Sequence, residues 1–169
     1  YFNSNSANVE FENNQLNNVG IYGVSEEFSD IQTIDIEYGR YLNEIEFQRG
    51  NAVGVMGYTN AEQLFGKAEK SIGKQVMFSG KKVTIIGVIK KQGQTILDGF
   101  DYDRSIILSY RCFASVYDVN SDFSQPFIMV NGKANVPTPV LSDELKGIMR
   151  QLRKLSPKQD DNFLLLLIR

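Results

Sequence analysis

Several residue types that usually carry enzyme chemistry are missing or rare in this chain. It has no histidine and no tryptophan, and its single cysteine is Cys112. Histidine is the commonest general base and the commonest metal ligand, so its absence argues against most hydrolytic and metal-dependent mechanisms. One cysteine excludes an internal disulfide and a zinc site built from several cysteines. We therefore expect no catalytic residue, no metal site and no cofactor.

Strong net charge and long apolar runs are also missing. The net charge is −2, too small to attract nucleic acid, so no nucleic-acid partner is expected. The longest apolar run, Phe163 to Ile168, is far shorter than the ~20 residues of a membrane helix. The chain begins with tyrosine and shows no signal peptide, so we expect it to be a piece of a longer protein.

One stretch in the middle of the chain has the pattern of a β-hairpin. Val76 and Phe78 alternate with Gln75 and Met77, and the β-branched run from Val83 to Ile89 follows Ser79-Gly80-Lys81. Alternation and β-branching favour strands, and the glycine allows the positive φ of a tight turn. The pattern predicts a hairpin whose second strand is buried on both faces, a scaffold without catalytic side chains.

Capping signals predict several helices. Asn43 and Glu46 form a capping-box pattern, with Gly50 placed to end the helix that follows. Thr59 is expected to cap a helix that ends at Gly66, and Ser109 a short helix that contains Cys112. Cys112 is expected to be a buried core residue, because no histidine can activate it.

The best helix pattern comes late, over residues 139–155. Its apolar residues recur at helical spacing on one face and are Leu141, Leu145, Ile148, Leu152 and Leu155. Strands are expected on either side of it, at 127–131 and 163–168, which together give a βαβ unit. The leucine face should cover that sheet, because leucine side chains are stabilising only when removed from water.

These patterns predict an α+β fold with two lobes. Residues 1–6 are polar and expected to be frayed, but the strands up to about residue 24 are expected to join the late βαβ unit. One discontinuous lobe would comprise residues 1–32 and 118–169. The short helices and tight turns of 33–117 would form an inserted β-rich lobe with its own core.

Two loops carry the candidate functional residues. The loops 94–103 and 118–126 place Phe100, Tyr102 and Phe123 among polar residues. Aromatic side chains on polar loops often contact a partner, although a small core beneath the loop is an equally good interpretation. Asp98, Asp101 and Asp103 suggest a calcium site, but the spacing does not match an EF-hand, and a solvated turn is the preferred interpretation.

Several short motifs, taken in order, resemble the periplasmic core domain of MacB-type ABC transporter permeases, a family with FtsX-like membrane helices. They cover roughly residues 19 to 168, and their succession is more specific than any one of them. The motifs are Tyr22-Gly-Val-Ser-Glu-Glu-Phe28, Tyr38-Gly-Arg-Tyr-Leu-Asn-Glu44, Ala52-Val-Gly-Val-Met-Gly57, Ala61-Glu-Gln-Leu-Phe-Gly66, Ile72-Gly-Lys74, Val83-Thr-Ile-Ile-Gly-Val88 and Asp143-Glu-Leu-Lys-Gly-Ile-Met-Arg150.

The resemblance implies a non-catalytic domain on the periplasmic side of the cytoplasmic membrane, in a permease that couples ATP hydrolysis to export or to mechanotransmission. The discontinuous lobe would lie near the membrane. Implied partners are a cytoplasmic ABC ATPase, a second permease copy and a periplasmic adaptor protein. An alternative is an FtsX-like regulatory domain that recruits a cell-wall hydrolase. A free-standing enzyme that uses paired carboxylates is a distant third hypothesis.

Overall fold

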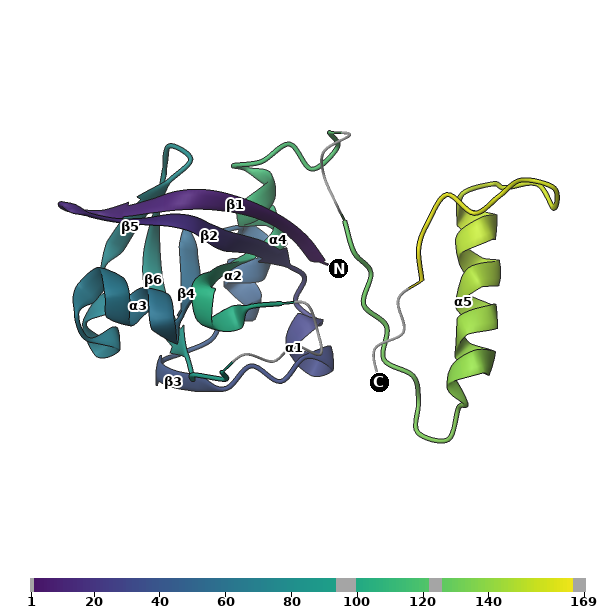
Figure 1. The fold of residues 1–169 in the computed structure, drawn as a ribbon, viewed down its shortest axis with the longest axis horizontal. Coiled ribbons are helices and arrows are strands. Elements are labelled where there is room, and N and C mark those ends of the chain that lie inside the picture. The colour runs from purple at the N-terminus through teal and green to yellow at the C-terminus, as the bar shows by residue number, and fades with distance from the viewer. Residues whose placement is uncertain (1, 94–99, 122–125, 166–169) are drawn as a thin grey trace. The chain divides into compact units, whose positions relative to one another are not determined.

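The structure, a computed structural model, describes residues 2–93, 100–121 and 126–165. It divides into two compact units, Tyr1–Met129 and Val130–Arg169, which we call the larger and the smaller unit. Both helices and strands are present, and the strands form one sheet in the larger unit (Figure 1). The α+β class predicted from the sequence is confirmed.

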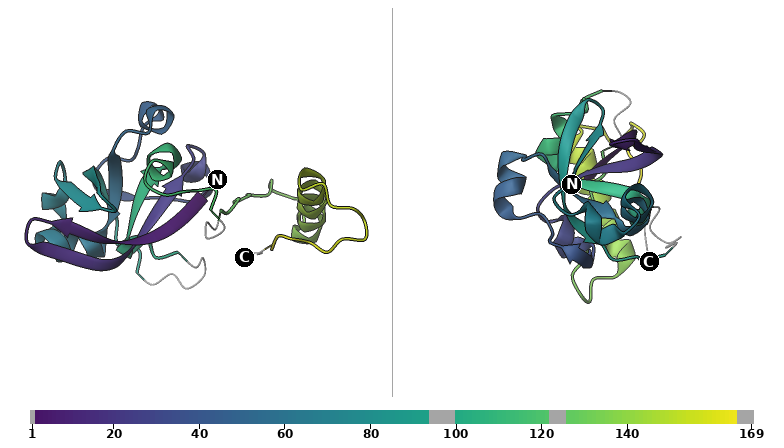
Figure 2. Two further views of the ribbon diagram at one scale, coloured as in Figure 1. Left: turned by 90° about the horizontal axis from the view of Figure 1, so that it is seen from above. Right: turned by 90° about the vertical axis from the view of Figure 1, so that its left-hand side faces the viewer.

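The larger unit is built on a mixed sheet that closes on itself. Its strand order is β3-β6-β4-β7-β2-β1-β5, and β5 pairs again with β6, so only β3 lies outside the closed ring. The long β1–β2 hairpin curves along one side of the unit (Figure 2). The strands are β1 (Phe2–Phe11), β2 (Asn14–Val24), β3 (Ile36–Gly39), β4 (Val53–Gly57), β5 (Gln75–Phe78), β6 (Lys81–Ile89) and β7 (Ser105–Ser109).

The predicted hairpin is confirmed as β5 and β6. Ser79 and Gly80 form its turn with φ values of 47° and 75°, as a two-residue turn between twisted strands requires. Burial of β6 on both faces is confirmed only for its last three residues, Gly87–Ile89. Earlier in the strand, Lys81, Lys82 and Ile86 are at least partly exposed, so that part is covered on one face only.

Alternating residues of the strands form a separate core on each face of the sheet. Ile106 and Leu108 of β7 belong to one core, and Ile107 between them belongs to the other. The first core receives buried residues from every strand of the closed ring, so it fills the face that the ring encloses. This arrangement explains why every residue of β7 is buried.

Five α-helices and two short 3-10 helices lie within the described residues. The Asn43–Glu46 capping box and the left-handed Gly50 are confirmed, and Ser109 Oγ accepts from the Cys112 N–H at 3.3 Å. Thr59 is not a cap, because the helix already begins at Tyr58, after Gly57. The helices are α1 (Phe28–Ile31), α2 (Glu44–Arg49), α3 (Tyr58–Phe65), η1 (Ala68–Ser71), η2 (Tyr102–Arg104), α4 (Tyr110–Ala114) and α5 (Thr138–Leu152).

The prediction that the strands up to about residue 24 join the late βαβ unit is wrong. β2 pairs with β7 from Gly20–Ser105 to Val24–Ser109, and β1 pairs with β5 at Glu10–Met77. Residues 2–24 therefore share one sheet with the strands of 33–117, because Val19 and Ile21 complete the enclosed core. The boundary between compact units falls after Met129, and not at residues 32 and 117. Residues 2–6 are also part of β1 and not frayed.

The late helix is confirmed as α5, but the strands expected beside it are not seen. Phe127 forms only an isolated bridge, with Phe2, and residues 128–131 and 163–165 belong to no strand. The rest of the predicted strand 163–168 lies outside the described residues. No residue of α5 is buried, and Leu152 is 70% exposed. The predicted packing of Leu145 and Leu152 against a sheet is therefore not found within the described residues.

Candidate interaction surface

The three residues predicted to contact a partner have different surroundings. Tyr102 is 6% exposed and lies in the core, so the partner prediction is wrong for this residue. Phe100 is half-buried, and the centroid of its ring lies 4.7 Å from that of Phe2. Phe123 lies outside the described residues. The alternative interpretation, a small core beneath the loop, is thus correct for Tyr102.

Tyr102 and Phe100 belong to an aromatic cluster that joins distant parts of the chain. Its ring centroids lie between 4.7 and 6.5 Å apart, the range of favourable tilted and edge-to-face contacts. Rings from β1, β2, α1, η2 and two loops meet here, so the cluster stabilises the unit as a whole. The members are Phe2, Tyr22, Phe28, Phe100, Tyr102 and Phe127.

At this cluster, the first and last segments of the larger unit are hydrogen-bonded to each other. The Phe2 N–H donates to the Phe127 carbonyl at 3.0 Å, and the Phe127 N–H donates to the Phe2 carbonyl at 2.8 Å. The Phe2 side chain is fully buried. We call this pair with its surrounding rings the Phe2–Phe127 clamp. It holds the two ends of the larger unit side by side.

The loop residues next to the clamp are fixed by a carboxylate. Asp103 is buried and accepts hydrogen bonds from the N–H groups of Gln92 and Gly93, at 2.9 and 3.0 Å. Asp101 accepts from the Arg104 N–H at 3.2 Å. These two carboxylates therefore bind backbone amides, and Asp98 lies outside the described residues. Within the part of the chain described, no three metal-ligating side chains are gathered.

A second carboxylate, Glu46, ties α2 to the chain before it. Its oxygens accept from both Arg40 Nη atoms, at 2.7 and 2.9 Å, and from the Asn43 N–H at 2.9 Å. The Glu46 residue is only 6% exposed, whereas the Arg40 side chain is 53% exposed. The hydrogen bonds from Arg40, followed by that from Asn43, lower the pKa of Glu46.

Glu46→Gln is expected to destabilise the larger unit in a pH-dependent way. Because the folded-state pKa is lowered, the carboxylate contributes its stability at neutral pH and loses it as the pH falls through that pKa. We expect a loss of about 1–2 kcal/mol at pH 7, a modest value because Arg40 is half-exposed. Urea titrations should show the difference from the unchanged chain shrinking from pH 7 toward about pH 3. Glu62→Gln, at an exposed site on α3, is the control. A loss of stability in Glu46→Gln that is equal at pH 7 and at the low-pH end of the titration would contradict the stabilising role of the Glu46 carboxylate.

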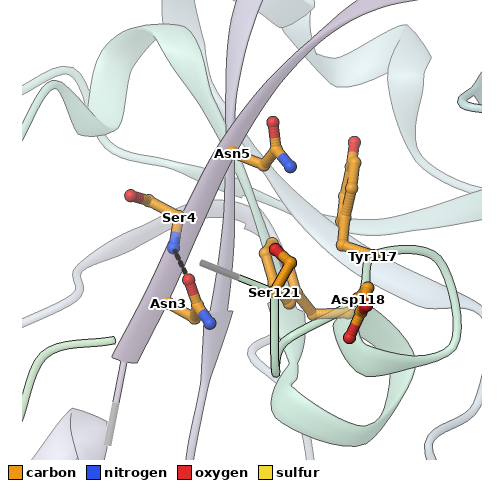
Figure 3. A pocket seen from close by; sticks show the side chains of 7 residues that line it. Asn3, Ser4, Asn5, Tyr117, Asp118 and Ser121 are labelled. Atoms are coloured by element: carbon orange, nitrogen blue, oxygen red, sulfur yellow. Dashed lines mark hydrogen bonds between the residues drawn. The ribbon is translucent and has the colours of Figure 1, made fainter. Parts of the chain in front are cut away.

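A shallow hollow of about 220 Å³ lies between β1, the end of α4 and the loop that follows α4 (Figure 3). Its lining includes Phe113 and Tyr117, whose ring centroids are 4.8 Å apart. The Tyr117 hydroxyl is hydrogen-bonded to Ser79 at 3.0 Å, so it is held by the β5–β6 turn. The polar lining residues are Asn3, Ser4, Asn5, Asp118 and Ser121.

Cys112 is not part of any reactive arrangement in the described chain. Its side chain is fully buried in the enclosed core, as predicted from the sequence. Burial raises the pKa of the thiol, and the nearby Lys81 only partly opposes this. The thiolate, which is the reactive form, is therefore disfavoured.

The smaller unit is organised by ionic contacts on α5. Asp161 pairs with Lys146, at 3.0 Å, and with Arg150. Arg150 Nη2 also donates to the carbonyls of Ser156 and Gln159, at 2.7 and 2.9 Å. These contacts hold the chain after α5 against the polar side of the helix. No helix in the described part of the chain is both long and apolar enough to cross a membrane.

Asp161→Asn should loosen the segment after α5. Hydrogen bonds from Lys146 and then Arg150 lower the pKa of Asp161, so the charged form makes the contact at neutral pH. We expect faster hydrogen exchange at the amides of Leu155 and Gln159, which donate to the carbonyls of Arg150 and Ser156. Asp160→Asn is the matched control, and exchange rates that are equal in the two variants would contradict this role.

Comparisons with known proteins agree with this architecture. A sequence profile of the MacB-like periplasmic core domain matches residues 2–148. The ABC transporter permease YknZ of Bacillus subtilis is 29% identical over 116 residues, 69% of this chain and 28% of YknZ. The macrolide export ATP-binding/permease protein MacB of Aggregatibacter actinomycetemcomitans is 27% identical over 89 residues, 53% of this chain and 14% of MacB. The chain thus spans about a quarter or less of these relatives.

Two solved structures share the fold. The periplasmic region of MacB from Actinobacillus actinomycetemcomitans matches with a TM-score of 0.72 and 21% identity, over 90% of this chain and 65% of that one. The extracellular domain of YknZ, from Gram-positive bacteria, matches with a TM-score of 0.59 and 20% identity, over 70% and 59%. With the profile match over most of its length, this chain belongs to the family of MacB-like periplasmic core domains.

Proposed function

We propose that the chain is a non-catalytic domain of an ABC transporter permease, held on the outer side of the cytoplasmic membrane. There it couples ATP hydrolysis by a cytoplasmic ATPase to movement outside the membrane. Family membership supports this placement, because the relatives are ABC transporter permeases and MacB is named for macrolide export. The absence of histidine from the sequence supports a role without chemistry.

The observation that carries the coupling role is the Phe2–Phe127 clamp. The first and last segments of the larger unit are hydrogen-bonded to each other at Phe2 and Phe127. A displacement of these two segments therefore moves the whole unit. The closed sheet has a packed core on each face, and packed cores deform little under load. The larger unit is therefore suited to move as a rigid body.

Partners and lobe organisation follow from the same proposal. We propose that the permease works as a dimer with its ATPase and a periplasmic adaptor protein. Helix α5 would belong to a membrane-proximal α/β lobe, since its apolar face is not buried within the described residues. Phe100, whose ring is half-buried, and Phe123 remain proposed partner contacts; Tyr102 does not.

A labelling experiment tests the placement. Ile45 is 55% exposed, whereas the native Cys112 is fully buried, so an Ile45→Cys variant of the full-length permease offers one reactive thiol in this domain. A membrane-impermeant maleimide should label it in intact spheroplasts, and the ATPase should co-purify. Labelling only after permeabilisation would contradict the proposal. Co-purification of a cell-wall hydrolase, with no ATP-dependent export, would favour the FtsX-like alternative.

A further inference from the structure

A short motif in the segment that leads into α5 carries chemistry of its own (Figure 1). Asn131-Gly132 is the only Asn-Gly pair in the sequence. Both residues belong to no helix or strand, and they precede a turn in which the Val136 N–H donates to the Lys133 carbonyl at 3.1 Å. Asn131 is exposed and Gly132 is half-buried. Solvent therefore reaches the asparagine side chain.

An asparagine followed by a glycine can react with its own backbone. The backbone nitrogen of the glycine approaches the side-chain carbonyl carbon of the asparagine and closes a five-membered ring. Glycine has no Cβ to hinder this approach, and its backbone samples conformations that other residues rarely adopt. The reaction requires a glycine nitrogen that is not held in a hydrogen bond and an asparagine side chain that is free to turn.

The contacts of this segment meet both requirements. Within the described residues, neither the Gly132 N–H nor the Asn131 side chain forms a hydrogen bond. A Cβ atom on Gly132 would lie 2.8 Å from Leu141 Cδ2, so Gly132 lies close to a side chain of α5. The exposed Asn131 side chain is thus free to turn, beside a backbone nitrogen that nothing holds.

The Asn5-Ser6 pair in β1 is a contrast within the same chain. Asn5 pairs with Ile21 and Ser6 with Gly20 in the β1–β2 ladder, and Asn5 Oδ1 accepts from the Ser6 N–H at 2.8 Å. These contacts fix both the backbone nitrogen and the side chain. The ring could close here only after the strand opens locally, so the fold protects this pair.

We propose that Asn131 is a site of spontaneous deamidation in the folded protein. The Gly132 nitrogen loses its proton and forms a bond to Cγ of Asn131, and the side-chain nitrogen leaves as ammonia. Water then opens the resulting succinimide at either of its two carbonyls. The products are aspartate and isoaspartate at position 131, and water is the only co-reactant. This inference does not depend on the transport role.

The modification changes the chain where it enters α5. Each event adds a negative charge beside Lys133, and isoaspartate also lengthens the main chain by one carbon. Gly132 follows the altered residue directly and lies against Leu141. A second set of NMR signals should therefore appear at the amides of Gly132, Lys133 and Leu141 as a 15N-labelled sample converts.

Mass spectrometry of the folded chain, incubated in neutral buffer, measures the conversion. The tryptic peptide that contains Asn131 should gain the mass of an amide-to-acid change, and fragmentation should identify isoaspartate. We expect the rate at Asn131 to lie within about threefold of the rate in a free peptide of residues 129–134, because no local opening is needed. At Asn5 the rate should be at least about tenfold below that in a free peptide of its own sequence.

Two variants test the route through the ring. Gly132→Ala should slow the conversion about two- to fivefold, because alanine restricts the backbone. Its Cβ would meet only the end of the Leu141 side chain, so the fold should survive. Asn131→Gln should convert more slowly still, since its longer side chain must close a larger ring.

Circular dichroism, followed throughout the incubation, shows that each sample stays folded. No conversion at Asn131 while the free peptide converts would overturn the proposal. Equal rates at Asn131 and Asn5 in the folded chain, or a Gly132→Ala variant that converts as fast as the unchanged chain, would overturn it as well.

Discussion

Phe2→Ala is expected to lower the free energy of unfolding of the larger unit by about 3–5 kcal/mol. Phe2 is fully buried, although it lies at the start of the first strand. Its ring contacts those of Tyr22, Phe28 and Phe100, with centroids 5.0, 5.8 and 4.7 Å away. Removal leaves a cavity lined by rings that are held by separate elements, so the surrounding structure cannot easily collapse into it.

Equilibrium urea unfolding measures this loss. Ile128→Ala is the control, because Ile128 follows Phe127 directly but is 62% exposed, and we expect a change within about 0.5 kcal/mol. A loss below about 1 kcal/mol for Phe2→Ala would mean that the start of β1 contributes little to the fold. The clamp would then be too weak to hold the two ends of the unit together.

Gly57→Ala is expected to destabilise the larger unit by about 3 kcal/mol or more. A Cβ atom on Gly57 would lie 2.1 Å from the Tyr102 carbonyl oxygen and 2.4 Å from that of Asp103. Both contacts are with backbone, which cannot rotate away as a side chain can. The added methyl group would push β4 from the segment that carries Tyr102, one ring of the aromatic cluster.

Gly147→Ala is the contrasting change. Gly147 lies within α5, and a Cβ atom there would meet nothing within 4 Å. Alanine has the higher helix propensity, so this variant should gain up to about 1 kcal/mol of helix stability. Thermal unfolding followed by circular dichroism compares the two variants. A Gly57→Ala variant as stable as the unchanged chain would show that β4 and the Tyr102 segment are not closely packed.

Local patterns predicted the local structure well. The β5–β6 turn needs positive φ at two adjacent residues, and Ser79-Gly80 is a short sequence that supplies it. The capping box of α2 needs only Asn43 and Glu46, three residues apart, and α5 needs only its apolar spacing. Each of these features depends on residues close in sequence, which is why they could be read without the fold.

Features that depend on distant residues could not be predicted. The parallel pairing of β2 with β7 joins residues 85 positions apart, and nothing in either strand specifies its neighbour. Asn3 to Ser6 have the composition of a frayed terminus, yet they form a strand because Phe2 anchors it and asparagine side chains cover its edge. Tyr102 is buried because Phe28 and Tyr22 meet it from other elements.

The surroundings of the candidate partner residues could not be predicted for the same reason. The sequence shows Phe100 only as an aromatic residue in a polar loop. Its ring is half-buried because the rings of Phe2, Tyr22 and Phe127 pack around it from other segments.

The distance between this domain and the membrane tests the coupling role most directly. The full-length permease, with its ATPase in lipid nanodiscs, would carry a fluorophore at Ile45→Cys and an acceptor on the lipid headgroups. A second pair of labels, at Ile45 and Glu62, would report on the shape of the larger unit. ATP binding should change the distance from Ile45 to the lipid but leave the Ile45–Glu62 distance unchanged. An unchanged Ile45–lipid distance during active ATP hydrolysis would contradict the coupling role, and a changed Ile45–Glu62 distance would contradict rigid-body motion.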